Sequence, residues 1–125
     1  MKTLFFGSNI FIYGMGKMGV RTYLLLKENN VRVKSFIDSS DIKQKMSFDE
    51  IGCISFGKYI EQYNKEDIVI VAINDNSVYE KLRDVLSCEV IYFRNIEKQI
   101  SRTYKRIKGF DELLKLRERF GGMIF

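Results

Sequence analysis

The stretch NIFIYGMGKMGVRT, residues 9–22, places three glycines directly behind a short run of apolar and β-branched residues. An apolar run of this kind, ended sharply by a glycine, is typical of a strand that is buried on both faces of a sheet. Gly14, Gly16 and Gly19 fit the pattern G-x-G-x-x-G, which forms a tight turn, admits a diphosphate and brings a helix close to a strand. Two interpretations are therefore open, a phosphate-binding turn or a tight connection between a buried strand and a helix.

Strands and helices are expected to alternate along the body of the chain. Hydrophobic periodicity predicts strands over 9–13, 32–38, 53–56, 67–73 and 89–93. It predicts one helix over 17–28, a short one over 58–63, and a third that begins at an N-cap residue, Asn76 or Ser77. The side chains expected to face the core from these helices are Val20, Tyr23, Leu24, Tyr59, Ile60, Tyr63, Val78, Leu82, Val85 and Leu86.

This alternation predicts an α/β protein with a Rossmann-like three-layer fold. Right-handed crossovers place helices on both faces of a five-stranded parallel sheet, and the simplest strand order is 3-2-1-4-5. Residues 1–94 form the expected domain. Ligands bind such sheets at the carboxyl ends of the strands, where the strand order reverses. Here the residues from Gly14 to Gly19 would face those from Ala72 to Asn76 across the crevice.

An acidic residue stands where a dinucleotide-binding turn requires one. Asp38 ends the second predicted strand, nineteen positions beyond Gly19, and such a residue accepts a hydrogen bond from a ribose hydroxyl. Ser39 and Ser40 follow it, with no arginine nearby to bind a 2′-phosphate, so NADP is disfavoured. The first-turn amides and the helix dipole would hold the diphosphate of NAD or of a nucleoside diphosphate sugar. The predicted binding residues are Gly14, Met15, Gly16, Lys17, Met18, Gly19, Asp38, Ser39, Ala72, Asn74 and Asn76.

Charge and composition narrow the possible functions. Residues 1–93 hold 12 Lys/Arg and 12 Asp/Glu, whereas residues 94–125 hold 9 and 4, so the net charge of +5 belongs to the C-terminal segment and does not indicate a nucleic-acid-binding body. No apolar run is long enough for a membrane span, and we expect a cytoplasmic protein. Cys53 and Cys88 are expected to be buried, and without any histidine they predict no metal site and no catalytic nucleophile.

The segment 95–125 is expected to form a basic helical tail. Ile96, Ile100, Tyr104 and Ile107 recur at helical spacing, and a second short helix is predicted before the final GGMIF. The tail would pack on the sheet, form a homodimer surface, or lead to a partner domain. The apolar terminus predicts that it packs against something or that the natural chain continues past Phe125.

The segments IFIYGMGKMGVRTYLLLKENNVRVKSFIDSS, CISFGKYIEQY and DIVIVAINDN resemble a family of bacterial domains. These are the small N-terminal Rossmann-like domains of sugar-modifying and surface-polysaccharide enzymes, above all the nucleotide-sugar-binding domain that precedes the left-handed β-helix of sugar acetyltransferases. Similar domains precede dehydratases or methyltransferases. The resemblance covers residues 9–93 and implies a UDP-sugar or related nucleotide bound through Gly14, Gly16, Gly19 and Asp38. The transferases take their catalytic histidine from the following domain, and this chain contains no histidine.

Three functions are consistent with these observations. The first is a nucleotide-binding module for bacterial glycan or surface-polysaccharide biosynthesis that is not catalytic as an isolated chain. The second is a small NAD-dependent sugar-nucleotide oxidoreductase or epimerase completed by a second subunit or domain. The third is a structural or assembly domain with an empty crevice. No catalytic residue is assigned in any of them.

Overall fold

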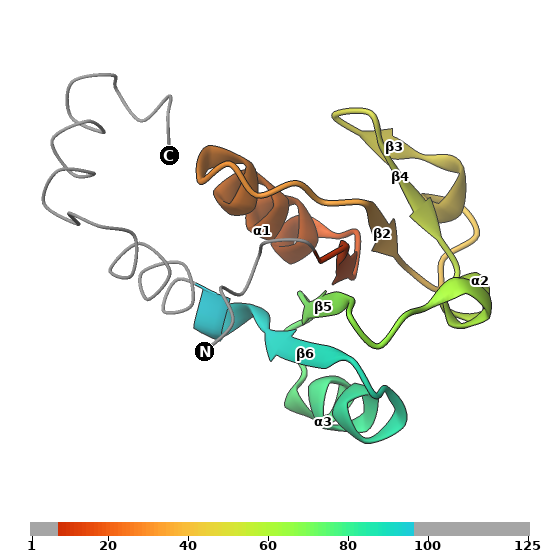
Figure 1. Cartoon of the computed structure of the whole chain (residues 1–125). Helices are drawn as coiled ribbons and strands as arrows, with labels where there is room; N and C mark the ends of the chain where they lie inside the picture. The colour runs from red at the N-terminus through yellow and green to blue at the C-terminus, as the bar shows by residue number, and fades with distance from the viewer. Residues whose placement is uncertain (1–7, 97–125) are drawn as a thin grey trace, which may run out of the picture.

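The structure is a computed structural model that describes residues 8–96. Its elements, in chain order, are β1 (Ile10–Tyr13), α1 (Lys17–Glu28), β2 (Ser35–Ile37), the 3₁₀ turn η1 (Lys43–Lys45), β3 (Ser47–Phe48), β4 (Ile51–Ile54), α2 (Phe56–Gln62), β5 (Ile68–Val71), α3 (Asn76–Val85), β6 (Glu89–Tyr92) and the 3₁₀ turn η2 (Phe93–Asn95). In this part of the chain, six strands and three α-helices make an α/β domain (Figure 1).

The six strands form one mixed sheet in the order β3-β4-β2-β1-β5-β6. Five of the strands pair in parallel, in the order β4, β2, β1, β5 and β6. β2 and β4 lie on one side of β1, whereas β5 and β6 lie on the other, so the strand order reverses between β1 and β5. β3 pairs antiparallel with β4 at one edge, with Ser47 opposite Gly52 and Phe48 opposite Ile51. The expectation of a sheet of five parallel strands was therefore wrong, because a sixth, antiparallel strand was missed.

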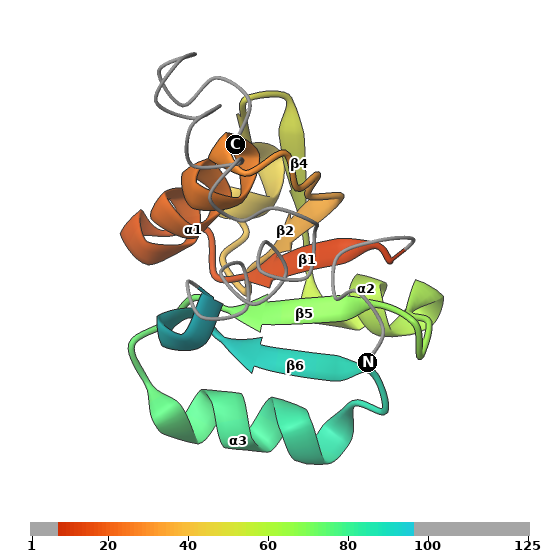
Figure 2. The same ribbon diagram turned by 60° about the vertical axis from the view of Figure 1, so that its left-hand side comes forward.

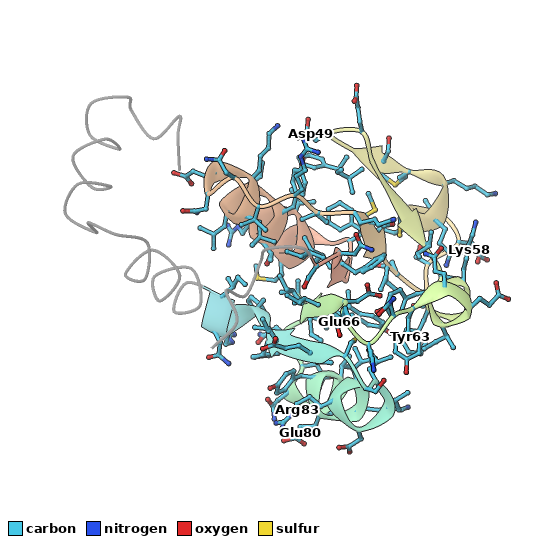
Figure 3. All side chains as sticks on the ribbon, in the orientation of Figure 1. Asp49, Lys58, Tyr63, Glu66, Glu80 and Arg83 are labelled. Carbon is cyan, nitrogen blue, oxygen red and sulfur yellow. The ribbon has the colours of Figure 1, made fainter. Side chains whose placement is uncertain are left out.

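The missed strand belongs to a β-hairpin whose two-residue turn lacks the usual turn residues. Asp49 and Glu50 connect β3 to β4 with φ angles of 53° and 67°, so both lie in the left-handed region. Two-residue hairpin turns of this geometry favour Asn-Gly or Asp-Gly. Glutamate at the second position does not indicate such a turn, which explains why the sequence did not predict it. Asp49 lies at the far end of the hairpin in Figure 3.

Helices cover both faces of the sheet. Ile10 and Ile12 of β1 belong to the apolar cluster that contains Tyr23 and Leu26 of α1. Phe11 belongs to a second cluster, on the opposite face, with Tyr59 of α2 and Leu82 of α3. Figures 1 and 2 show α1 on one side of the central strands and α3 on the other. The residues of β5, and those of β1 except the half-buried Tyr13, are buried on both faces as their apolar runs predict.

The helices agree with the predicted ones more closely in position than in orientation. α1 spans the predicted 17–28, and Tyr59 and Leu82 are buried as expected. Three other side chains expected to face the core are exposed, and these are Leu24 (48%), Ile60 (38%) and Val85 (57%). Each has an apolar neighbour one to three positions away that occupies the buried face instead, so the spacing alone did not fix the orientation.

Other predictions have mixed outcomes. Cys53 and Cys88 are both buried, as expected. The tail predicted for 95–125 lies outside the described residues except for its first two positions, and Ile96 is buried in the α1 cluster. Among the helices of residues 8–96, none combines the length and the apolar character that crossing a membrane requires.

Candidate functional site

The turn after β1 is held between the neighbouring strands. The Gly14 amide donates a hydrogen bond to the Ile37 carbonyl of β2 (2.7 Å), and the amide of Ala72, after β5, donates to the Tyr13 carbonyl (2.9 Å). Gly14 has a φ of +109°, a conformation that side chains with a Cβ rarely adopt. A Cβ there would also lie 2.8 Å from Cγ1 of Ile73. The first glycine is therefore required by the backbone conformation of the turn.

The third glycine is required by packing. A Cβ on Gly19, in the first turn of α1, would lie 1.8 Å from the carbonyl oxygen of Gly14. No two nonbonded heavy atoms tolerate that separation, so only a residue without a side chain lets α1 pack this closely against the end of β1. Gly19 thus performs the close helix–strand packing expected of the last glycine in the pattern.

The middle glycine is required by neither constraint. Gly16 is the N-cap of α1 with φ −97° and ψ −158°, an extended conformation available to any residue. A Cβ there would meet only Nζ of Lys43, at 4.0 Å. Glycine at this position therefore leaves a bare space beside the helix N-terminus that neither the backbone nor the packing of the domain needs.

Asp38 lies beside the turn, as predicted, and already holds it. Its Oδ2 accepts a hydrogen bond from the Met15 amide (2.8 Å), and its Oδ1 accepts one from the Ser40 amide (2.9 Å). The carboxylate thus links the end of β2 to the peptide between Gly14 and Met15. Each carboxylate oxygen has two lone pairs, so both keep capacity for a further donor such as a ribose hydroxyl.

Lys43 is a residue of this cluster that the sequence did not indicate. Its Nζ donates to the Met15 carbonyl (2.7 Å) from η1, the 3₁₀ turn in the segment 38–46. The side chain of Gln44 donates to the Asp38 carbonyl (2.8 Å), and the Lys43 amide donates to Oγ of Ser40 (3.3 Å). Loops of this kind show no hydrophobic periodicity, and the only local signal was a serine three residues before the lysine.

The first turn of α1 has amides available for a ligand at the helix N-terminus. Gly16 offers no side-chain cap, and the first N–H groups of a helix have no partner within it. The Met15 amide, which was expected to help hold a phosphate, is bonded to Asp38.

Lys17 begins the helix and is exposed. Met18 is half-buried against the α1 cluster, and it lines a shallow pocket together with Phe93.

Of the other residues predicted to bind the ligand, those that follow β5 are buried or already hydrogen-bonded to other side chains. Buried Ala72 lies directly against Gly14, because its carbonyl oxygen is 3.1 Å from the position of a Gly14 Cβ. The side chain of Asn74 accepts a hydrogen bond from Arg94 (2.6 Å), and that of Asn76 donates to Glu80 (3.0 Å), which lies on α3 in Figure 3. Ser39 is exposed on the loop after Asp38.

The N-cap of α3 differs from the predicted one. The Asp75 side chain caps this helix by accepting a hydrogen bond from the Ser77 amide (3.0 Å), in place of the expected Asn76 or Ser77. An aspartate just before a helix that accepts from the amide of the second helical residue is a strong capping residue. The stretch 74–76 therefore has a capping function that accounts for its middle residue.

The charge of Asp38 acts on two neighbouring groups. Burial raises the pKa of the Cys53 thiol, and the Asp38 carboxylate raises it further. The same two causes, in the same order, raise the pKa of the Tyr13 phenol. Both groups therefore stay protonated near neutral pH, and neither is prepared to act as a nucleophile or base. Within residues 8–96, no three His, Cys, Asp or Glu side chains gather closely enough to bind a metal ion.

No protein-family model matches the chain, and no curated protein matches it. The resemblance to the nucleotide-sugar-binding domains of sugar acetyltransferases thus rests on the sequence segments that contain the glycine turn, Asp38 and residues 53–63 and 67–76.

Proposed function

We propose that the chain is a Rossmann-like nucleotide-binding module whose glycine turn binds the diphosphate of a nucleoside diphosphate sugar or of NAD. The five parallel strands support the Rossmann-like assignment, since their order β4-β2-β1-β5-β6 is the predicted 3-2-1-4-5. β3 is an antiparallel addition at the β4 edge. The glycine turn follows β1 at the carboxyl end of the sheet, next to the reversal of strand order where such sheets bind ligands.

The observation that carries the proposal is the bare position at Gly16. Gly14 and Gly19 have structural reasons to be glycine, whereas Gly16 has an ordinary backbone conformation and room for a Cβ. A side chain there would occupy the space beside the first-turn amides, which is where a diphosphate binds at a helix N-terminus. A ligand phosphate explains why that space is kept empty.

The proposed role is binding rather than catalysis by this chain alone. The groups around the turn are a carboxylate engaged by two backbone amides, a lysine bonded to a carbonyl, and a phenol and a thiol with raised pKa values. None of these is an activated acid, base or nucleophile. In a glycan or surface-polysaccharide pathway, such a module would hold a sugar nucleotide for a partner domain or subunit that supplies the chemistry.

A second candidate function is a structural domain with no ligand. The backbone of Met15 favours this structural alternative, because the Met15 amide is bonded to Asp38 and the Met15 carbonyl is bonded to Lys43. The turn is thus partly satisfied by the protein's own groups, as a connection without a ligand would be. Under this alternative Gly16 is explained only by its N-cap position, where glycine is one of several preferred residues.

A thermal denaturation series separates the two functions. Wild-type protein is heated with UDP-glucose, UDP-N-acetylglucosamine, NAD, NADP or coenzyme A. A ligand at one hundred times its dissociation constant should stabilise the fold by about 2.7 kcal/mol. For a domain of this size, that raises the melting temperature by roughly 10 °C. A shift with a UDP-sugar or NAD and none with NADP is expected, whereas no shift with any nucleotide contradicts the binding function.

Gly16→Val is the informative variant, and Gly52→Val is its matched control. Valine at 16 should leave the protein folded and abolish the ligand-induced shift, because its branched side chain fills the proposed phosphate position. Gly52 is an exposed residue of β4 where a Cβ would meet nothing within 4 Å, so valine there should change neither folding nor the shift. If Gly16→Val responds to ligand as wild type does, the turn is not the binding site.

A further inference from the structure

We propose that Lys43 is the phosphate-binding cation of the glycine turn and that it makes the site selective for anionic ligands. This inference rests on the proposed nucleotide-binding function. It assigns the role to a loop lysine that was not among the predicted binding residues, rather than to Lys17 in the turn itself. Four observations on the cluster around Met15 support it.

The first observation is position. Nζ of Lys43 lies 4.0 Å from the point where a Cβ of Gly16 would lie, so the ammonium group borders the bare space. An ammonium group has three donor hydrogens, and the bond to the Met15 carbonyl uses one of them. A phosphate oxygen that occupies the space beside Gly16 would therefore lie within reach of Lys43 without movement of its backbone.

The second observation is that the segment carrying Lys43 is organised by its own hydrogen bonds. Ser40 accepts from the Lys43 amide through its side chain (3.3 Å) and from the Gln44 amide through its carbonyl (3.0 Å). The Gln44 side chain closes the loop by donating to the Asp38 carbonyl (2.8 Å). A cation on a loop fixed in this way loses little conformational entropy when it binds an anion.

The third observation concerns charge. The Asp38 carboxylate holds the Met15 amide, so it places a negative charge next to the space proposed for a diphosphate. A diphosphate in that space would be repelled unless a cation compensated. Lys43 binds the carbonyl of the same residue and supplies a positive charge there. Asp38 can therefore keep its place beside a ribose while the ammonium group offsets its effect on the phosphates.

The fourth observation is the contrast with Lys17 and Lys45. Lys17 is exposed on the first residue of α1, and Lys45 is exposed on η1, two residues beyond Lys43. Lys43 is half-buried and its ammonium group is held at the turn by the bond to Met15. Of these three lysines, Lys43 is the one whose ammonium group is fixed beside the site.

The test measures binding of inorganic pyrophosphate, UDP, NAD and uridine by titration calorimetry at low ionic strength. The proteins are wild type, Lys43→Met, Lys43→Arg, Lys17→Met and Lys45→Met, each checked for folding by circular dichroism. Lys43→Met retains the side-chain stem and loses the charge, so pyrophosphate and UDP should bind about tenfold more weakly, the loss expected for one charged hydrogen bond. Lys43→Arg should restore most of the affinity, and Lys45→Met should bind like wild type.

The remaining outcomes separate the inference from the function on which it rests. Equal binding of UDP by wild type and Lys43→Met overturns the role of Lys43 and leaves the nucleotide site standing. A tenfold loss in Lys17→Met instead assigns the phosphate to Lys17. Pyrophosphate binding that depends on Lys43, without any binding of UDP or of NAD, refutes the nucleotide function and keeps the anion site. No binding of pyrophosphate or nucleotide by wild type refutes both.

A purely structural lysine is also distinguishable. If Lys43 only secures the loop, Lys43→Met should speed hydrogen exchange of the Met15 amide and lower the melting temperature with no change in pyrophosphate affinity. That combination overturns the proposal.

Discussion

Gly19→Ala should be the most destabilising substitution in the glycine turn. The added Cβ would lie 1.8 Å from the carbonyl oxygen of Gly14 and 2.8 Å from its carbonyl carbon. Carbon and oxygen atoms approach no closer than about 3.3 Å in ordinary weak contacts, so the two groups must separate by about 1.5 Å. α1 would then lose its packing on the sheet, where Tyr23 and Leu26 are buried. We expect a loss of more than about 3 kcal/mol, above the usual range for overpacking.

The other two glycines provide graded comparisons. Gly14→Ala should cost about 1–2 kcal/mol for its positive φ, plus the adjustment of one Ile73 methylene group that lies too close. Gly16→Ala should cost only about 0.5–1 kcal/mol, because alanine is a poorer N-cap than glycine and its Cβ has room. The expected order of destabilisation is therefore Gly19, Gly14, Gly16.

Urea denaturation followed by far-ultraviolet circular dichroism measures this order. The free energy of unfolding comes from linear extrapolation, and similar denaturant slopes among the variants would show that the comparison is valid. If the free energy of unfolding of Gly19→Ala lies within about 1 kcal/mol of that of Gly16→Ala, α1 does not pack as closely on the end of β1 as the structure shows. The distinction between structural glycines and a glycine kept for a ligand then fails with it.

Three further predictions concern stability and reactivity elsewhere. Glu50→Gly should raise the free energy of unfolding by about 0.5–1 kcal/mol in urea titrations, because glycine relieves the left-handed strain at φ 67° and offsets part of that gain through its own chain entropy. Burial, followed by the hydrogen bond to Asp49, raises the pKa of Tyr23 from 10.0 to about 12, so the stability linked to its proton is present below pH 10 and lost as pH rises towards 12. Tyr23→Phe should flatten the alkaline loss of stability over that range, and an unchanged slope would contradict this origin. Burial raises the pKa of both Cys53 and Cys88, so a thiol reagent should react slowly with folded protein and rapidly in urea, and equal rates would refute their burial.

The sequence predicted best those elements whose stabilisation is local or strongly patterned. The helix over 17–28 was placed correctly because a glycine turn begins it and two asparagines end it. β5 was predicted because uninterrupted valine and isoleucine have few alternatives to a central strand. β3 was missed because its two residues, Ser47 and Phe48, carry no pattern and depend on pairing with β4.

The candidate site was predicted in the same uneven way. The turn and Asp38 were brought together correctly, since the parallel pairing of β1 and β2 aligns their carboxyl ends. The contact of Lys43 with Met15 was not predictable, because it requires the loop after β2 to fold back over the turn. Asn74 and Asn76 follow β5 as expected, yet their side chains bond to Arg94 and Glu80, partners that a single sequence does not reveal.

The near contact of Gly19 with Gly14 determines which of the segments around the glycine turn can adapt. A helix packed directly on main-chain atoms has little clearance to slide or tilt, so we expect α1 and β1 to move together. The segment 38–46 reaches the turn through the side chains of Asp38 and Lys43, whose torsions change easily. Adjustment to ligands of different size would occur in that segment. If the proposed nucleotide binds at the glycine turn, redesign of its specificity should therefore vary residues 39–46 and leave the glycines unchanged.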